Sequence, residues 1–277
     1  MKDDLIPKTL LRAVGRAIGD YGMIRHGDRI LLGVSGGKDS LSLLHILRHF
    51  QRHAPIPFGL GVITVDPVVP GFDPSPLKGV MNTLRVPYFY EQQPILEQAQ
   101  GHMGKDSFCA FCSRMKRGIM YRVARNAGYN VLALAQHLDD LAESFLMSAF
   151  YAGQLHTMRA HYLNDAGDLR VIRPLVYSRE RQLADFATRQ GLPVIPDNCP
   201  ACFTAPTQRA HMKQLLAAEE RTRPHLFKSL LSAMRPLMGD PATDERPGEQ
   251  TPSAWQSDAA RPPPAALTGR VERNRPW

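Results

Sequence analysis

The chain has 277 residues, of which 43% are hydrophobic, so it is long enough for one substantial domain with additions. It has no apolar run of about 18 residues and no signal-peptide core after Met1, so we expect a cytoplasmic protein with no membrane partner. The net charge of +8 makes nucleic acid the first candidate partner, although a merely soluble basic surface explains the charge equally well.

A helix, a buried strand and a second helix are predicted at the start of the chain. Apolar residues at helical spacing predict an amphipathic helix over 8–22. The apolar run 30–34 predicts a strand of a parallel sheet that is buried on both faces. Helical spacing resumes at Leu41 and continues to about His53, so a helix follows the strand after a short turn.

That turn is predicted to bind phosphate. It consists of Ser35, Gly36, Gly37, Lys38, Asp39 and Ser40. Glycines let a ligand approach the backbone, the N–H groups of a helix start attract anions, and Lys38 adds a positive charge. Asp39 stands where a Walker loop needs Ser or Thr, and the G-x-G-x-x-G pattern of dinucleotide folds is missing. The alternative is a glycine turn without a ligand.

A second strand is predicted over 60–66. Asp66 ends it, at the edge where open parallel sheets place ligand groups, so it is a candidate ATP-binding residue. A short helix over 75–85 and a third strand over 87–90 follow, and the polar stretch 91–106 is predicted to be a loop.

A basic helix is predicted after the pair Cys109-x-x-Cys112. Met115, Ile119 and Val123 repeat at helical spacing. The basic residues beside them are Arg114, Lys116, Arg117, Arg122 and Arg125. We interpret these as contacts to an RNA backbone, and the alternative is a solvated charged face.

A fourth strand over 129–135 leads into another polar turn and helix. His137, Asp139 and Asp140 lie in that turn, at the same predicted edge of the sheet as the first turn. The two aspartates could simply cap the helix, or could hold Mg²⁺ on ATP, since hard oxygen ligands suit that ion. Carboxylates beside a histidine favour the chemical interpretation.

The last third of the chain is predicted to contain one more strand and several helices. A strand over 169–173 precedes a helix capped by Ser178, and 207–237 form a helical appendix broken at Pro224. From Gly239 onward seven of 39 residues are Pro, which predicts a disordered tail. That tail has a net charge of −1, so the positive charge lies in the body of the chain.

These elements predict an α/β fold with a doubly wound parallel sheet and flanking helices. The expected organisation is an N-terminal helix (1–25), an ATP-binding domain with a metal site (26–200), the helical appendix (201–238) and the disordered tail (239–277).

Four cysteines form two pairs, Cys109 with Cys112 and Cys199 with Cys202. In a chain without a secretion signal, such pairs indicate metal or redox chemistry rather than structural disulfides. Four thiolates suit a zinc site as well as an iron–sulfur cluster. A non-catalytic, zinc-stapled ATP- and RNA-binding protein is therefore an alternative to an enzyme.

The motif Ser-Gly-Gly-Lys-Asp-Ser at 35–40 resembles the signature of the PP-loop ATP pyrophosphatase superfamily, whose fold is adenine nucleotide alpha hydrolase-like. Further motifs resemble the tRNA 2-thiocytidine biosynthesis family, and these lie at 65–72, 109–118, 133–140, 150–153, 171–175, 179–180 and 195–196. The resemblance runs in order through about residues 10–230. A lysidine-type tRNA ligase shares the first loop but would not need the cysteine pairs.

The resemblance implies an ATP-dependent tRNA sulfurtransferase. The C2 oxygen of cytidine 32 would attack the α-phosphate of ATP, and sulfide would then replace the adenylated oxygen. Catalytic roles fall to Lys38, Asp39, His137 and Asp140, with the 35–40 loop, Asp66 and Asp139 binding ATP. The implied cofactors are ATP, Mg²⁺ and a [4Fe–4S] cluster on Cys109, Cys112 and Cys199, with Cys202 as a possible fourth ligand. The implied partners are tRNA, a sulfur donor such as a cysteine desulfurase, and a second copy of the chain.

Three positions depart from the family pattern. The chain has Gln136 where the family usually has His, and Arg159-Ala160 where it usually has a Pro pair. Cys199-Pro200 looks more like the related tRNA 2-thiouridine enzymes. Thiolation of a uridine by the same chemistry is therefore the alternative reaction.

Overall fold

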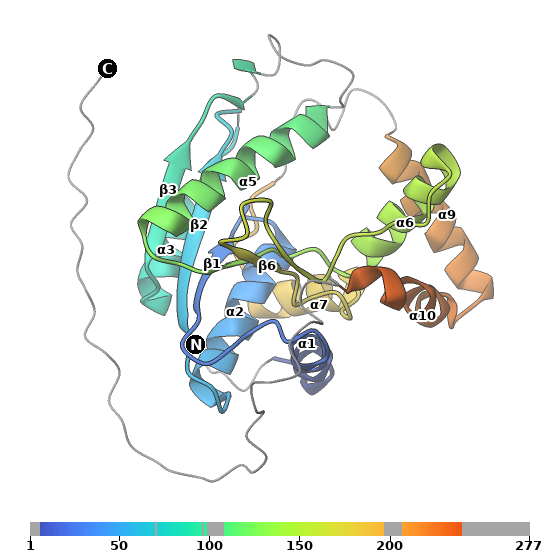
Figure 1. Ribbon diagram of the computed structural model, residues 1–277, viewed down its shortest axis with the longest axis horizontal. Helices are drawn as coiled ribbons and strands as arrows, with labels where there is room; N and C mark the ends of the chain where they lie inside the picture. Colours follow the sequence, from blue (N-terminus) through green and yellow to red (C-terminus); the bar gives the residue numbers. More distant parts are fainter. Residues whose placement is uncertain (1–5, 70, 96, 99–107, 197–206, 240–277) are drawn as a thin grey trace. The chain divides into compact units, whose positions relative to one another are not determined.

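The computed structural model describes residues 6–69, 71–95, 97, 98, 108–196 and 207–239, apart from the side chains of Phe108 and Cys109. These residues belong to one compact unit, Met1–Glu245, and the predicted tail lies outside the described residues except for Gly239. The helices (Figure 1) are α1 (Lys8–Asp20), α2 (Lys38–His53), α3 (Ser75–Leu84), α5 (Phe108–Asn126), α6 (Leu138–Ala152), α7 (Glu180–Gln190), α9 (Gln208–Thr222) and α10 (Leu226–Met238).

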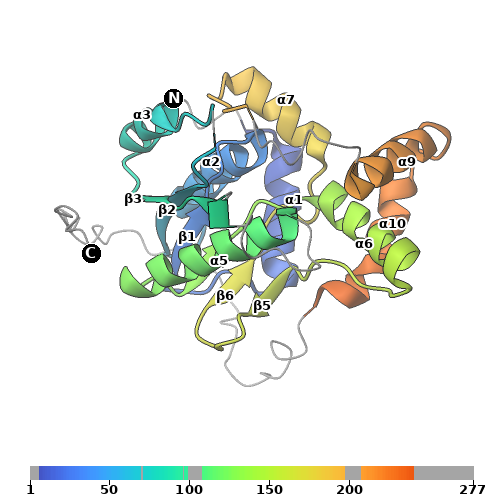
Figure 2. The same ribbon diagram turned by 90° about the horizontal axis from the view of Figure 1, so that it is seen from above.

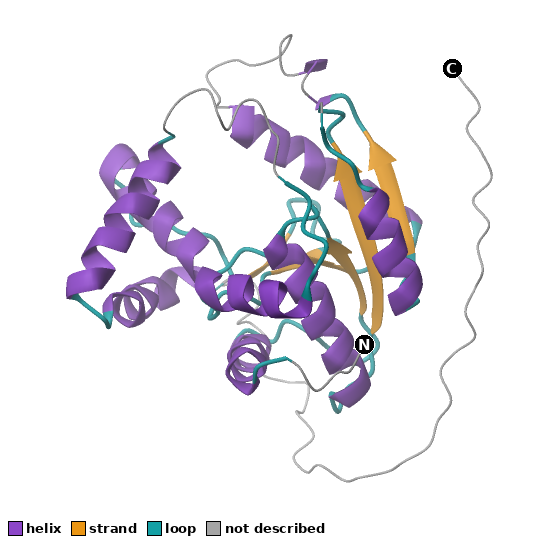
Figure 3. Ribbon diagram, turned by 180° about the vertical axis from the view of Figure 1, so that it is seen from behind, coloured by secondary structure: helices purple, strands orange, loops and turns teal. Residues whose placement is uncertain are grey.

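Six strands form one sheet in the order β3-β2-β1-β4-β6-β5. Figure 3 shows strands of this sheet in orange among the purple helices. They are β1 (Arg29–Gly33), β2 (Gly59–Asp66), β3 (Tyr88–Gln92), β4 (Val131–Ala133), β5 (His161–Leu163) and β6 (Arg170–Ile172). Every neighbouring pair is parallel except β5 with β6. This mostly parallel sheet with flanking helices confirms the predicted α/β class.

Both faces of the sheet are buried, as the continuous apolar run of β1 predicts. Ile30 and Leu32 join the cluster of apolar side chains that includes α1, α2 and α7. Leu31, between them, joins a second cluster that includes α5. Figure 2 shows α5 on one side of the sheet and α2 and α7 on the other.

The terminal helices are part of the same packed unit. Leu10 and Val14 of α1 are buried in the larger cluster, as are Leu216 of α9 and Met234 of α10. The helices α9 and α10 both pack against α6. The four-part division expected from the sequence stays a prediction. Among the described helices, none has the length and apolar character needed to cross a membrane.

Three local predictions differ from the structure. The stretch 91–106 was predicted to be a loop, but β3 continues to Gln92 and Ile95 is helical. The antiparallel strand β5 has only three residues, and a segment this short carries no readable alternation. Ser178 is fully buried and does not cap α7, because Arg179 takes the cap position in extended conformation.

The parallel strands end at one edge of the sheet. The turn after β1 leads into α2, the turn after β4 leads into α6, and Asp66 ends β2. Because parallel strands present their carboxyl ends together, the two predicted polar turns meet at this edge.

Candidate nucleotide site

The turn from β1 to α2 depends on a close approach at Gly36. This residue has a φ of +90°, a conformation that L side chains rarely adopt. A Cβ atom added there would lie 2.8 Å from Cδ1 of Ile195. The backbone N–H of Ile195 donates a hydrogen bond of 2.9 Å to the Gly36 carbonyl, so the 192–196 segment is fastened to the turn.

Two serines fix the shape of the turn. The Ser40 hydroxyl donates to the Gly37 carbonyl at 3.0 Å, and the Ser35 N–H donates to the Ser40 hydroxyl at 3.3 Å. Gly37 occupies the N-cap of α2, and in the described chain no side chain caps this helix start. An uncapped helix N-terminus offers backbone N–H groups to an anion, as the sequence predicts.

Lys38 is held between two carboxylates. Its Nζ lies 3.0 Å from Oε1 of Glu180 and 3.2 Å from Oδ2 of Asp39. Burial alone would lower the pKa of Lys38, but hydrogen bonding and charge from Glu180 and Asp39 outweigh it and raise the pKa. The ammonium group is therefore fully charged and stands beside the phosphate turn.

Asp39 has one carboxylate oxygen that could coordinate a cation. Its Oδ1 is buried and has no hydrogen-bond partner among the described residues. Its Oδ2 faces Nε2 of His137 at 3.8 Å. Burial raises the pKa of Asp39, against the opposing charges of His137 and Lys38. A buried oxygen without a donor is a suitable ligand for a hard cation.

His137 and Asp140 form the N-terminal cap of α6. Asp140 N–H donates to Nδ1 of His137 at 3.3 Å, and His137 N–H donates to Oδ2 of Asp140 at 3.0 Å. His137 is buried, with its ring next to Asp39 and Asp140. The capping role of Asp140 is therefore observed, and its predicted contact with Mg²⁺ stays a prediction.

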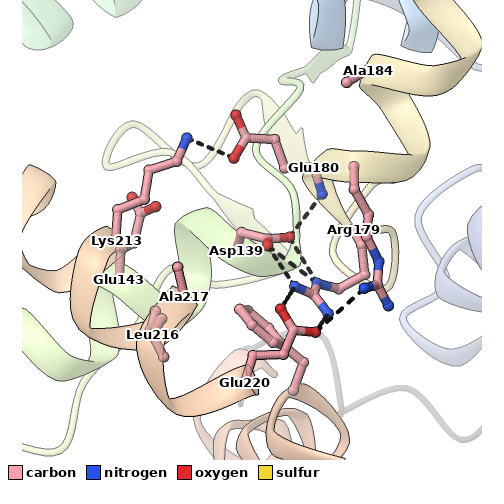
Figure 4. Close-up of a pocket in the computed structure, with 11 residues that line it drawn as sticks. Asp139, Glu143, Arg179, Glu180, Ala184, Lys213, Leu216, Ala217 and Glu220 are labelled. Atoms are coloured by element: carbon pink, nitrogen blue, oxygen red, sulfur yellow. Dashed lines mark hydrogen bonds and ion pairs between the residues drawn. The ribbon is translucent and has the colours of Figure 1, made fainter. Parts of the chain in front are cut away.

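Asp139 points toward α7 and is engaged by Arg179. Arg179 donates to Asp139 through Nε and Nη2 at 3.0–3.2 Å, and to Glu220 of α9 at 2.7 and 2.9 Å (Figure 4). The backbone N–H of Glu180 also donates to Asp139, at 2.8 Å. The guanidinium carbon of Arg179 lies 3.3 Å from the ring centroid of Phe227. Asp139 is thus a structural anchor, and its predicted contact with ATP stays a prediction.

Two cavities adjoin these residues. A cavity of about 260 Å³ lies around Asp139, Arg179 and Glu220. A second, of about 300 Å³, is lined by Asp39, His137, Asp140, Glu143, Glu180, Thr207, Arg209, Ala210 and Lys213. The second volume is at the lower end of the roughly 300–1,000 Å³ typical of ligand pockets. It joins the two predicted polar turns in one site.

Several residues of this site were not predicted from the sequence. Arg209 of α9 lies 3.4 Å from Asp140 and 3.2 Å from Glu143, and Lys213 lies 2.7 Å from Glu180. Burial raises the pKa of Glu143 to about 7. Burial would raise the pKa of Glu180, but hydrogen bonds from Lys213 and Lys38 outweigh it and lower the pKa to about 2. Two features of the sequence could have indicated these residues: the Arg179-Glu180 motif, and the four-residue spacing that puts Arg209 and Lys213 on one face of a helix.

Asp66 is engaged within its own turn. Its Oδ1 accepts a hydrogen bond of 2.7 Å from Val68 N–H, and its Oδ2 accepts from the Tyr90 hydroxyl. Burial and this contact with Asp66 raise the pKa of Tyr90 to about 12. The predicted ATP contact of Asp66 stays a prediction.

The cysteine site is described only in part. Cys109 and Cys112 lie one turn apart in the first turns of α5, and Cys112 is half-buried against the apolar cluster beneath that helix. Cys199 and Cys202 lie outside the described residues. Across the described ranges, no group of three or more His, Cys, Asp or Glu side chains is placed to hold a metal ion.

The predicted RNA contacts all lie on α5. Arg122 pairs with Glu91 at 2.7 Å and Arg125 with Asp168 at 2.6 Å, both at exposed positions. Exposed ion pairs of this kind contribute little to stability. These two arginines can therefore exchange their carboxylate partners for phosphate groups. Arg114 is exposed, and Lys116 and Arg117 are half-buried. Their role in binding RNA stays a prediction.

Known proteins resemble this chain over most of its length. A family model for the PP-loop domain matches residues 8–216. The tRNA-cytidine(32) 2-sulfurtransferase of Geobacter sulfurreducens is 40% identical over 235 residues, which cover 84% of this chain and 91% of that protein. The enzyme of that name from Pelobacter propionicus is 40% identical over 228 residues, which cover 82% and 85%.

A solved structure has the same fold. The U34-tRNA thiolase NcsA from Methanococcus maripaludis with its [4Fe–4S] cluster superposes with a TM-score of 0.69 at 20% identity, covering 90% of this chain and 82% of that one.

Proposed function

We propose the function of this chain from the premise that it belongs to the PP-loop domain family and, within it, to the tRNA-cytidine(32) 2-sulfurtransferases. The chain is an ATP-dependent tRNA sulfurtransferase that thiolates cytidine 32. The C2 oxygen of the base attacks the α-phosphate of ATP and pyrophosphate leaves. A sulfur nucleophile then adds at C2 and AMP leaves, carrying the former base oxygen.

Lys38 is the residue we propose to stabilise the departing pyrophosphate. Its ammonium group stands beside the glycine turn and the uncapped start of α2. The hydrogen bond to Glu180 keeps it charged and aimed at this place before ATP arrives. Preorganised charge of this kind acts where negative charge develops in the transition state.

Asp39 and Asp140 fit the Mg²⁺ that accompanies ATP. Asp39 offers a buried oxygen without a partner, and Asp140 lines the same cavity. Mg²⁺ is usually held by one or two carboxylates together with substrate phosphates, so two carboxylates suffice. When bound, the ion would neutralise phosphate charge. His137, next to both carboxylates, would position them, and its predicted role as a proton carrier stays open to test.

A [4Fe–4S] cluster is proposed on Cys109, Cys112 and Cys199, with Cys202 as a possible fourth ligand. The donor set fits, because thiolates are the usual ligands of iron–sulfur clusters and two of these cysteines lie one turn apart on α5. When bound with three protein ligands, the cluster would supply an iron site for sulfur. The proposal extends to a sulfur donor such as a cysteine desulfurase, a homodimer and a cytoplasmic location.

The convergence of Lys38, Asp39 and Asp140 at one edge of the sheet is the observation that carries the catalytic assignment. A strain lacking the gene should lose 2-thiocytidine from digested tRNA, measured by mass spectrometry, and the wild-type gene should restore it. Lys38→Ala should fail to restore it although the variant is folded, because the leaving group loses its cation. Normal 2-thiocytidine in the deletion strain would contradict the function, and full restoration by Lys38→Ala would contradict the role of Lys38.

A further inference from the structure

The helix α9 contributes positive charge to the nucleotide site. Arg209 and Lys213 lie four residues apart, so they share one face of this helix. Both line the cavity of about 300 Å³ that also contains Asp39 and His137. Part of the cavity wall is therefore built by a helix more than 150 residues later in the chain than the phosphate turn.

Arg209 is held loosely in this structure. Its Nη1 lies 3.4 Å from Asp140 and 3.2 Å from Glu143, whereas N⁺–H···O⁻ hydrogen bonds are normally about 2.7–2.9 Å. In the part of the chain that the structure describes, Nε and Nη2 make no hydrogen bond, and the side chain is 43% exposed. Arg179, in contrast, uses Nε, Nη1 and Nη2 in five contacts of 2.7–3.2 Å. Arg179 is fixed by the fold, but Arg209 has donors to offer a ligand.

We propose that Arg209 is a phosphate-binding residue of this site and donates to an oxyanion of the departing pyrophosphate of ATP. The assignment rests on the proposed function. The planar guanidinium presents its donors as a fork that matches a phosphate group. In the free enzyme, Asp140 and Glu143 hold this fork at the cavity, and the nucleotide phosphates take their place.

Lys213 keeps Glu180 paired when Lys38 changes its partner. Glu180 is shared by Lys38, at 3.0 Å from Oε1, and Lys213, at 2.7 Å from Oε2. When Lys38 turns from Glu180 to phosphate, Lys213 still neutralises that half-buried carboxylate. Lys213 is thus a positioning residue, whereas Lys38 at the start of α2 and Arg209 on α9 contact the leaving group.

Calorimetric titration of the full-length protein with sodium pyrophosphate, and separately with AMP, tests this assignment. Arg209→Ala should weaken pyrophosphate binding about tenfold or more, because a charged hydrogen bond is lost, and should leave AMP binding unchanged. Arg209→Lys should lose an intermediate amount, because it keeps the charge without the fork. Arg221→Ala is the matched control, since Arg221 is an exposed arginine of the same helix outside both cavities.

Wild-type pyrophosphate affinity in Arg209→Ala would overturn the proposal, and so would an equal loss of pyrophosphate and AMP, which would make Arg209 a support for α9. If Arg209→Ala does not fold, the selective loss in Arg209→Lys decides. The wild-type protein is assayed for tRNA thiolation in parallel. Selective loss in the variants, with no thiolation by the wild type, would contradict the proposed function and leave the phosphate contact standing.

Discussion

Gly36 is the residue whose replacement should damage the phosphate turn most directly. Gly36→Ala places a Cβ 2.8 Å from Ile195 and forces a non-glycine residue to a φ of +90°. We expect a loss of about 1–3 kcal/mol in the free energy of unfolding, measured by urea denaturation.

Gly118→Ala is the control for that substitution. Gly118 lies within α5, and a Cβ there meets nothing within 4 Å. Gly118→Ala also reduces the conformational entropy of the unfolded chain, and here no strain opposes that effect. It should therefore stabilise the protein by about 0.5–1 kcal/mol. Equal effects of the two substitutions would contradict the strained turn.

Glu143 should make the free energy of unfolding depend on pH between pH 5 and pH 8, a range in which most carboxylates are already ionised. Its folded-state pKa of about 7 lies above the unfolded value of 4.5, so the folded protein binds the proton more tightly. This contribution to stability is complete below pH 4.5 and is lost as the pH rises to 7. Glu143→Gln should therefore gain stability relative to the wild type between pH 5 and pH 8, by up to roughly 3 kcal/mol.

Urea unfolding of both proteins across that pH range measures the difference. Glu219→Gln is the control, because Glu219 is an exposed carboxylate of α9 in a surface pair with Arg223. A difference curve for Glu143→Gln as flat as that of the control would show that Glu143 is ionised throughout.

Among the individual site residues, those that lie in contiguous motifs could be predicted from the sequence. Lys38, Asp39 and Asp140 stand beside glycine or histidine in turns with a readable chemistry, and all three meet in the structure. Arg209 and Glu143 were missed because each comes from a helix whose local pattern records only which face is apolar. Which charged face meets a distant turn is set by tertiary packing, which a single sequence does not display.

Four helices meet around Arg179. Its ion pairs join the start of α6 through Asp139 to α9 through Glu220, and its guanidinium covers Phe227 of α10. Arg179→Met should leave two partly buried carboxylates without their cation and cost on the order of 3 kcal/mol in the free energy of unfolding.

Arg181→Met tests whether that loss is specific. Arg181 is 68% exposed and lies 3.6 Å from Glu220, so its replacement should change stability by less than about 0.5 kcal/mol. Urea denaturation of both variants measures the two changes. A loss in Arg179→Met as small as that in Arg181→Met would mean that the ion pairs of Arg179 do not stabilise the fold.

The elements that sequence patterns predicted well are those with a long, regular burial pattern. The buried strands β1 and β2 and the helices α1 and α2 were placed to within a few residues, because both faces or one stripe of each must be apolar. The strand β5 was missed because its three residues are fixed by pairing with β6 and by the turn at Gly167, not by a pattern of their own.

The basic helix α5 should govern how tRNA affinity responds to salt. Arg114 and Arg117 are on the helix that covers one face of the sheet, and phosphate contacts release counterions. Replacing both with Ala should reduce the slope of log affinity against log salt by roughly 1–2, measured by filter binding at several salt concentrations.

Arg12 and Arg189 provide the matched control, because they are exposed arginines on α1 and α7, which pack against the other face. Replacing both with Ala removes the same net charge and should leave the slope unchanged. A similar decrease of the slope in both double variants would mean that tRNA responds to the net charge of the protein and not to a binding surface on α5.

The site built by α2, α6, α7 and α9 has a consequence for the order of biosynthesis. A ribosome releases Lys38 and Asp39 early, but Arg209 and Lys213 emerge only after the whole sheet has been made. Until then the acidic side chains of the cavity lack two of their cations. A prematurely terminated chain that ends before α9 should therefore bind pyrophosphate more weakly than the full-length protein does.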